Sequence, residues 1–430
     1  MPDSQPRRPD DNAPDSADAA TTADHPALVL GGARLADGRA VDVRVSGSRI
    51  EAVGTAGSLT ARGPRVDLRG YLLLPAPAEP HAHSDTALTA DSAGPGPASH
   101  RAEDIQRRAT EAALLQLGHG ATALRTHVRV GDVQGLAPLE AVLQTRRALR
   151  GIADVMPVAV PRLLTGVAGA DSLAMLRDAV GMGAAVVGGC PDLDPDPTGY
   201  TEAVLEIAAE HGCPVDLHTD GDDPARLARL AAMAAGLRPG VTLGPCGGLA
   251  HLPLEAATRA ADQLAAAGIA VVCLPQGGCA GAERRTTAPV RLLRSAGVRV
   301  AAGSGAVRDT ANPVGRGDPL EAAYLLASQA GLRAEQAYAS VSTAARAALG
   351  LPCVRVEAGF PAELLAVRGE RLSAALSLGY SRIVIHGGRI VARTSAVREY
   401  CDSDADADAI AGLGGLPRQG RPDSGAGPRN

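Results

Sequence analysis

The motif Glu79-Pro80-His81-Ala82-His83 decides the fold of this 430-residue chain, and it follows the apolar run Tyr71-Leu72-Leu73-Leu74-Pro75. Side chains of a β-strand alternate between its two faces, so histidines that are two residues apart point to the same side. Two imidazoles that converge on one point are what a bound metal ion needs. The motif therefore predicts a metal site at the end of a strand.

Apolar runs typical of buried strands alternate with amphipathic, helix-like windows between about residue 72 and residue 350. The eight apolar runs are residues 72–75, 121–126, 155–160, 184–188, 214–218, 241–244, 269–274 and 298–302. Eight βα units favour a closed barrel over an open doubly wound sheet. We therefore predict an α/β protein with a (β/α)8 TIM barrel over residues 75–350.

Short alternating segments separated by turn residues occur at both ends of the chain, on either side of the predicted barrel. They predict a small composite β-sandwich built from residues 27–74 plus 355–396. Residues 1–26 and 401–430 carry few large apolar side chains, a composition that predicts disordered tails.

The composition excludes several classes of protein. A net charge of -5 without a basic stripe argues against nucleic acid as a partner. Seven cysteines without a CxxC pair argue against a disulfide framework and favour a reducing compartment. The chain lacks an apolar stretch of about 18 residues, which argues against a membrane span. We expect a cytoplasmic protein that acts on a small molecule, and leave open whether it forms a homo-oligomer.

In a (β/α)8 barrel the active site lies at the C-terminal ends of the strands. His81 and His83 follow the first apolar run, and His218 ends the fifth. Three imidazoles at the mouth are a candidate site for one divalent ion, Zn²⁺ or Fe²⁺, with an open position for water. No motif for a nucleotide cofactor accompanies them.

Several segments in order along the chain resemble the cytosine deaminase branch of the amidohydrolase superfamily, and the resemblance covers roughly residues 27–395. The segments are Gly70–His83, Arg125-Thr126-His127, Val215–Asp220, Leu274-Pro275 and Val307–Asp318. The resemblance implies a metal-dependent barrel with a composite sandwich that hydrolyses amino or amide C–N bonds. It also implies metal ligands or catalytic groups from the HxH pair, a His after strand 5, a Glu three residues later, a His after strand 6 and an Asp after strand 8.

Three of these positions match the resemblance, namely His81, His83 and His218. The other three hold Pro245 in place of the strand-6 His, Gly305 in place of the strand-8 Asp and Gly221 in place of the Glu. Each lost acid or base role is worth typically about 10²–10⁴-fold in rate. We therefore expect ordinary deamination to be impaired unless Asp220 or Asp222 serves as the catalytic base.

The resemblance also implies a Gln after strand 3 that contacts the pyrimidine, but Arg162 stands there. A guanidinium favours a carboxylate or phosphate over a neutral base, which argues against cytosine as the substrate. We expect His127 to support the site by hydrogen bonding and Asp309 to lie in a loop over the barrel mouth. Arg162, His127 and Asp309 are thus the candidate substrate-binding residues.

Three functions remain open. The favoured one is a divergent amidohydrolase that acts on a C–N bond of a small, anionic metabolite other than cytosine. The second is a metal-independent enzyme that carries out a cyclisation or rearrangement in the same barrel. The third is a non-catalytic relative that binds a ligand or a partner.

Overall fold

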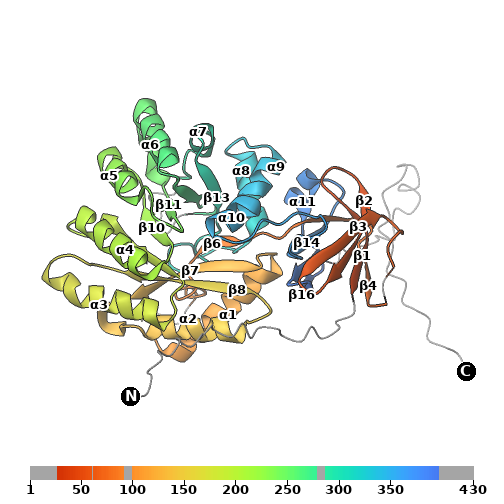
Figure 1. Ribbon diagram of the computed structural model, residues 1–430, viewed down its shortest axis with the longest axis horizontal. Coiled ribbons are helices and arrows are strands. Elements are labelled where there is room, and N and C mark those ends of the chain that lie inside the picture. The colour runs from red at the N-terminus through yellow and green to blue at the C-terminus, as the bar shows by residue number, and fades with distance from the viewer. Residues whose placement is uncertain (1–26, 61, 92–98, 278–285, 397–430) are drawn as a thin grey trace, which may run out of the picture. The chain divides into compact units, whose positions relative to one another are not determined.

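A computed structural model describes residues 27–60, 62–91, 99–277 and 286–396 of the chain. Figure 1 shows two groups of strands in this part of the chain, a barrel surrounded by helices and a separate sheet. The tails expected at 1–26 and 401–430 lie outside the described residues.

The barrel is an eight-stranded parallel sheet, and its strands follow the order of the sequence. The strands are β6 (Glu79–Ala82), β7 (Ala123–Val130), β8 (Asp154–Pro161), β9 (Val186–Gly189), β10 (Val215–Thr219), β11 (Val241–Pro245), β12 (Ala270–Cys273) and β13 (Arg299–Ala302). The residues after β13 return to β6, because Ala82 forms a parallel bridge with Gly305 and the Gly305 N–H donates to the His81 carbonyl at 3.1 Å. The predicted (β/α)8 barrel is confirmed.

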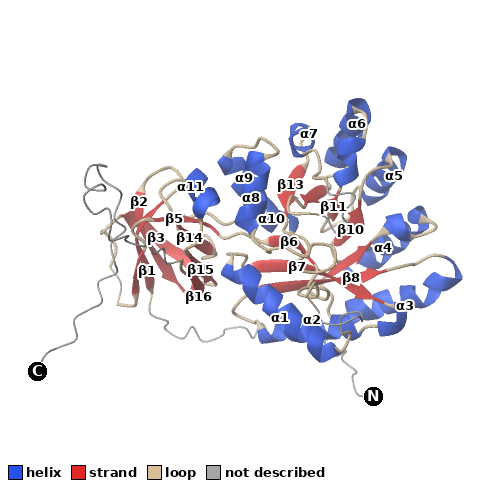
Figure 2. Ribbon diagram, turned by 180° about the vertical axis from the view of Figure 1, so that it is seen from behind, coloured by secondary structure: helices blue, strands red, loops and turns tan. Residues whose placement is uncertain are grey.

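Helices surround the barrel strands on the outside, as the view from behind shows (Figure 2). They are α1 (Ala102–Gly118), α2 (Ala137–Ala148), α3 (Gly166–Met182), α4 (Pro197–His211), α5 (Pro224–Ala234), α6 (Leu254–Ala266), α7 (Val290–Ser295), α8 (Pro319–Ser328), α9 (Ala334–Val341) and α10 (Thr343–Ala348), with short 3-10 turns η1 (Asp132–Gln134), η2 (Pro191–Leu193) and η3 (Gly247–His251). Local sequence sets their starts: Asp223 caps α5 by accepting the N–H groups of Ala225 and Arg226, and Pro224 occupies the first helical position. Within the described residues, no helix combines the length and the apolar character that crossing a membrane requires.

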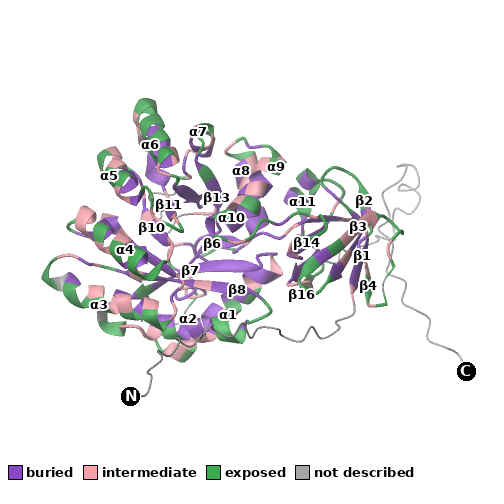
Figure 3. Ribbon diagram, in the orientation of Figure 1, coloured by how far each residue is buried: buried purple, intermediate pink, exposed green. Residues whose placement is uncertain are grey.

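The barrel strands are mainly buried, whereas the helices bury one side and expose the other (Figure 3). In α6, Ala257, Ala260, Ala261 and Leu264 are buried, at the three- and four-residue spacing of one helix face. The interior of the barrel is therefore filled by side chains, and the polar groups that lie inside it require a specific explanation.

The second sheet, called here the terminal sheet, combines strands from both ends of the described chain in the order β16-β15-β14-β5-β1-β2-β3, with β4 beside β1. Its strands are β1 (Leu28–Arg34), β2 (Ala40–Ser46), β3 (Arg49–Thr55), β4 (Arg65–Asp67), β5 (Tyr71–Pro75), β14 (Leu364–Arg368), β15 (Arg382–His386) and β16 (Arg389–Thr394), and α11 (Leu372–Leu378) lies between β14 and β15. The predicted composite unit built from both chain ends is confirmed.

One predicted barrel strand is wrong. The apolar run 72–75 belongs to β5, which pairs with β14 and β1 in the terminal sheet, and the first barrel strand is the short β6. Leu72, Leu73 and Leu74 are all buried. A central strand of either sheet shows this same pattern of continuous burial, so an apolar run alone does not distinguish the two positions.

The terminal sheet is held to the barrel by buried polar contacts. The guanidinium of Arg382 donates to both carboxylate oxygens of Asp318, at 2.8 and 2.7 Å, and both side chains are largely buried. Tyr338 on α9 donates its hydroxyl to the carbonyl of Pro75 at 2.7 Å. These contacts fix β5, and with it the start of the connection to His81.

Candidate metal centre

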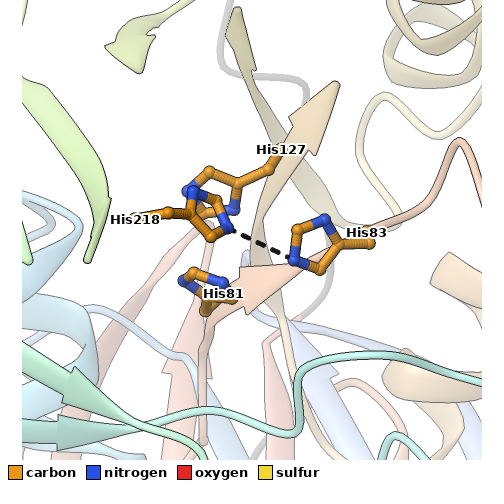
Figure 4. A group of neighbouring side chains, drawn as sticks. All are labelled: His81, His83, His127 and His218. Carbon is orange, nitrogen blue, oxygen red and sulfur yellow. Dashed lines mark hydrogen bonds between the residues drawn. The ribbon is translucent and has the colours of Figure 1, made fainter. Parts of the chain in front are cut away.

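Four imidazoles meet at the C-terminal ends of three barrel strands (Figure 4). His81 lies in β6, His83 directly after it, His127 in β7 and His218 in β10. Each offers one ring nitrogen, and these four nitrogens lie within 4.8 Å of one another. The expected convergence of His81, His83 and His218 is observed, and His127 joins them.

The spacing of the cluster suits a metal ion. The Nε2 atoms of His83 and His218 are 3.4 Å apart. Two histidine nitrogens bound tetrahedrally to Zn²⁺ at about 2.0–2.1 Å are separated by about 3.3 Å. The four ring centroids lie 4.2 to 5.4 Å from one another, so the donors surround a common point. The residues present therefore fit a divalent ion.

The protonation of the cluster also suits a metal ion. Burial, with the charge of Arg129 as a second cause, lowers the pKa of His83 to about 4. Burial and the neighbouring His83 lower the pKa of His218 to about 3. Burial likewise holds the pKa values of His81 and His127 well below the usual range. The rings are therefore neutral at pH 7, the state in which an imidazole donates a lone pair to a metal.

A buried ion pair lies directly beneath the histidines. Arg125 Nη1 donates to Asp216 Oδ2 at 2.9 Å and to Thr242 Oγ1 at 3.3 Å. The other carboxylate oxygen of Asp216 lies 3.3 Å from His127 Nε2, and His127 Nδ1 lies 3.4 Å from the carbonyl of Ala82. Within the described residues, neither His127 Nε2 nor Asp216 Oδ1 makes a hydrogen bond, so the Ala82 carbonyl beside Nδ1 is the contact that orients the His127 ring.

Glu79 fixes the first histidine from the other side. Glu79 Oε1 accepts the N–H of His81 at 3.0 Å, and Oε2 accepts the N–H of Ser304 at 2.9 Å and also its hydroxyl. Burial raises the pKa of Glu79 to about 7, against the effect of the bonds from Ser304. The carboxyl group therefore joins β6 to the segment after β13 at the level of His81.

The cluster opens into a pocket of about 410 Å³. His83, His127 and His218 form one part of its wall. Arg129 and Arg162 contribute two guanidinium groups, and Asp309 contributes a carboxylate. The remaining lining is Thr86, Val130, Val160, Pro161, Cys190, Leu193, Ala306, Thr310 and Ala311. A small molecule with an anionic group and an apolar face matches this lining.

The predicted substrate-binding residues all line this pocket. Arg162 lies just after β8 and is exposed, whereas Asp309 is buried. Asp309 Oδ1 accepts the N–H groups of Ala311 and Asn312, and Oδ2 accepts the hydroxyl of Thr86 at 3.0 Å. Asp309 thus faces the pocket and also organises the loop after β13.

The predicted catalytic carboxylates lie elsewhere, since neither Asp220 nor Asp222 is among the residues that line the pocket. Asp220 Oδ1 accepts the N–H of Gly248 at 2.9 Å, and the Asp220 N–H donates to Asp192 at 3.0 Å. Asp222 is exposed and lies beside Gly248. The Asp220 carboxylate thus bonds the segment after β11, whereas Asp309 is the acidic residue among the described residues that line the pocket.

Gly305 and Gly221 stand where the family resemblance implies an Asp and a Glu, and the backbone conformation at both positions favours glycine. Gly305 has φ of +69°, and a Cβ there would lie 3.3 Å from a methyl group of Leu274. Gly221 has φ of +72°, and a Cβ there would face Leu249. Side chains are disfavoured at positive φ. Pro245 ends β11 opposite Thr219.

Sequence reasoning missed Arg125, Asp216, Arg129 and the grouping of His127 with the other histidines. One signal pointed to them, namely the two-residue period of the strands. Arg125 and His127 share the inner face of β7, and Asp216 and His218 share the inner face of β10. Polar residues that recur every second position on the inner face of a barrel indicate a site with a supporting layer, here the Arg125–Asp216 pair beneath His127 and His218.

The fold and these residues define a (β/α)8-barrel protein with a histidine cluster at the barrel mouth, and comparison with known proteins gives its family. The profile of the Amidohydrolase family matches residues 102–392. The chain belongs to this family.

Particular relatives are as follows. The chain is 27% identical over 390 residues to a pterin deaminase of Rhizobium rhizogenes, which covers 82% of this chain and 88% of the relative. The solved N-isopropylammelide isopropylaminohydrolase of Burkholderia multivorans is 28% identical, with a TM-score of 0.75 over 86% of this chain and 98% of that one. The 5-methylcytosine deaminase of Klebsiella pneumoniae, at 24% identity and a TM-score of 0.76 over 86% of this chain and 99% of that one, shows the shared fold.

Proposed function

We propose that this chain is a metal-dependent hydrolase that breaks a C–N bond of a small, anionic metabolite other than cytosine. The observation that carries the proposal is the convergence of four imidazoles, three of which line a pocket that also presents two arginines and one carboxylate. The similarity to a pterin deaminase and to N-isopropylammelide hydrolases supports C–N bonds as the target.

The metal would be held by His81, His83 and His218, with His127 as the fourth imidazole of the cluster. A divalent ion held there supplies Lewis-acid activation of water at neutral pH. Glu79 holds the backbone of His81, and the Ala82 carbonyl orients the ring of His127, so that these two donors keep their geometry without the ion.

The acid–base role is assigned to Asp309 in this proposal. Its Oδ2 lies at the pocket wall, where it accepts a proton from the nucleophile and returns it to the leaving nitrogen. The hydroxyl of Thr86 donates to the same oxygen and orients it. A direct role for Asp220 or Asp222 stays a prediction.

Arg162 and Arg129 bind the anionic part of the substrate. They approach from β8 and β7, on the side of the pocket that also contains His83 and His127. A carboxylate between two guanidinium groups gains charged hydrogen bonds that a neutral ring such as cytosine lacks. The anion therefore orients the scissile C–N bond toward the histidines.

The proposal is tested by metal analysis together with a turnover assay on the full-length chain. Protein purified without chelator is expected to contain about one Zn²⁺ or Fe²⁺ per chain. It is then offered matched pairs of amino-substituted heterocycles, with and without a ring carboxylate, and release of ammonia or amine is measured. We expect release from the carboxylated member of a pair.

Two results would contradict the proposal and favour an alternative. Less than about 0.1 metal per chain after reconstitution with Zn²⁺, Fe²⁺ or Mn²⁺ removes the hydrolytic mechanism, since activation of water needs the ion. Turnover that persists without metal would favour the metal-independent enzyme. Tight binding of the carboxylated compounds without any turnover would favour the non-catalytic relative.

A further inference from the structure

A second pocket lies at the opposite end of the barrel from the histidines. Its volume is about 520 Å³. It is lined by residues at the N-terminal ends of β10 to β13, among them Pro214, Val241, Ala270 and Arg299, and by the end of α10. We call it the basal pocket. The proposed hydrolysis makes no use of it.

The charged lining of the basal pocket is entirely positive among the described residues. Arg125, Arg238 and Arg299 line it, and none of the described lining residues is Asp or Glu. Arg238 and Arg299 are exposed. In the described part of the chain, neither has a carboxylate within 4.0 Å of its guanidinium. Because the charge of Arg125 is balanced by Asp216, the two exposed guanidinium groups supply the positive charge that favours an anion in this pocket.

Arg125 lines this pocket and carries one N–H group that lacks an acceptor. Its side chain is 1% exposed, and Nη1 is bound to Asp216 and Thr242. Its Nε, by contrast, is buried without a hydrogen-bond partner. A buried N–H without an acceptor is costly, and a ligand is one of the ordinary ways in which such a group is satisfied. Thr242 lines the same pocket and offers a hydroxyl beside Arg125.

The wall around these groups is made largely of small residues. Gly236, Gly240, Gly268 and Gly350 line it together with several alanines. The cavity is many times larger than the roughly 30 Å³ that one water molecule occupies in the liquid. It therefore has room for an oxyanion with an organic part attached.

We propose that the basal pocket binds a small molecule through an oxyanion, with Arg238 and Arg299 at its entrance and Arg125 and Thr242 at its inner end. A planar guanidinium pairs with two oxygens of a phosphate or a carboxylate, so these two anions share the required chemistry. The site is independent of the proposed hydrolysis. It shares with the candidate metal centre only the Arg125–Asp216 pair, whose other side contacts His127.

The test is isothermal titration of the full-length chain with inorganic phosphate and, separately, with malonate. We expect saturable binding of at least one anion to wild type. The double variant Arg238→Ala/Arg299→Ala is expected to bind it at least about tenfold more weakly, because it lacks both charged donors at the entrance. Arg147→Ala, which removes the charge of an exposed arginine on α2, is expected to bind as wild type does.

A parallel titration separates this site from the pocket at the histidines. Arg162→Gln should keep the anion site, since Arg162 does not line the basal pocket. Binding that is lost in Arg162→Gln and kept in the double variant would place the anion at the histidines and overturn the proposal. Equal affinity of wild type and double variant, or no binding of either anion to wild type, would also overturn it. Circular dichroism confirms that each variant is folded.

Discussion

Two sides of the barrel mouth differ sharply in what they offer to chemistry. The histidine side, formed by β6, β7 and β10, presents His81, His83, His127 and His218. The bare side, formed by the ends of β11 and β13, has Pro245 and Gly305 at the positions where the family resemblance implies a His and an Asp.

The difference shows how a metal centre can be kept while its acid–base half changes. The histidine side rests on two buried supports, Glu79 and the Arg125–Asp216 pair. They also bond the bare side, through Ser304 after β13 and Thr242 of β11, but not through the positions of Pro245 and Gly305. At Gly305 the positive φ and the close approach to the Gly277 carbonyl and Leu274 disfavour an aspartate in the present backbone conformation. Replacement groups must therefore come from neighbouring loops, and Asp309 lies in one of them.

The largest effect is expected from a substitution in the histidine cluster itself. His81→Ala removes a fully buried donor of the cluster, so bound metal should fall from about one per chain to less than about 0.1, and hydrolysis should become undetectable. Elemental analysis and the amine-release assay measure the two quantities. His211→Ala, an exposed histidine at the end of α4, is the matched control and should retain both. Activity that survives in His81→Ala would remove the metal from the mechanism.

The support beneath the histidines comes next. Asp216→Asn leaves the charge of buried Arg125 without its partner, and we expect it to lower the free energy of unfolding by about 3–5 kcal/mol. Urea denaturation measures the change. The double variant Arg125→Met/Asp216→Leu removes both charges and should regain much of the loss. A single variant as stable as wild type would mean that the pair does not support the site.

A third experiment compares two candidate catalytic bases, Asp309 and Asp220. Asp309→Asn keeps an oxygen for the N–H groups of Ala311 and Asn312 but can no longer carry a proton. We expect kcat to fall by about 10²-fold or more with the fold intact. Asp220→Asn should leave kcat nearly unchanged, because its carboxylate accepts the N–H of Gly248 outside the pocket. A larger loss of kcat in Asp220→Asn than in Asp309→Asn would identify Asp220 as the catalytic base.

The charge at the pocket wall gives a smaller effect. Arg162→Gln restores the residue type that the family resemblance implies, and it should raise KM for a carboxylated substrate about tenfold, or about 1.4 kcal/mol, through loss of a charged hydrogen bond. KM for the neutral analogue should not rise. Steady-state kinetics on a matched pair of substrates measures the change in KM for the carboxylated and for the neutral member. An equal change in KM for both members would contradict the proposal that Arg162 binds an anionic group of the substrate.

The last prediction concerns the pH dependence of the stability of the metal-free protein. The folded state lowers the pKa of His83 to about 4 and that of His218 to about 3, below the ordinary value of 6.5. Between pH 6.5 and about pH 4 the unfolded chain therefore binds protons that the folded chain does not. Stability should fall as the pH falls through this window, by up to about 1.4 kcal/mol per pH unit for each histidine. Urea titrations of the chelated protein measure the slope, and in His83→Gln the slope should be shallower. An unchanged slope would contradict this account of the cluster.

Much of the fold could be predicted from the sequence. Seven of the apolar runs, from 121–126 to 298–302, overlap barrel strands, because each is bounded by helical periodicity and turn residues. The run 72–75 was misplaced because continuous burial is common to the centre of both sheets. The sequence did not reveal β6 as a separate strand, because only three residues separate it from β5 and its sequence contains Pro80.

The candidate site was predicted in part. Strand periodicity brings His81, His83 and His218 to one mouth, but local sequence does not say how far His127 reaches along β7, which continues to Val130. The positions of Asp220 and Asp309 depend on loops, whose paths are set by contacts such as those of Gly248 and Thr86. Such contacts join segments far apart in the chain, and no local pattern encodes them.

The pairing of β5 with β14 has a consequence for synthesis. Leu72 lies opposite Val367, so β5 lacks one of its two neighbouring strands until almost the whole chain has left the ribosome. The barrel strands between them are complete earlier and can close first. Until β14 arrives, Leu72, Leu73 and Leu74 remain an open apolar edge of the kind that promotes aggregation. A chain that stops before residue 364 is therefore expected to keep every histidine of the cluster and still to accumulate as insoluble protein.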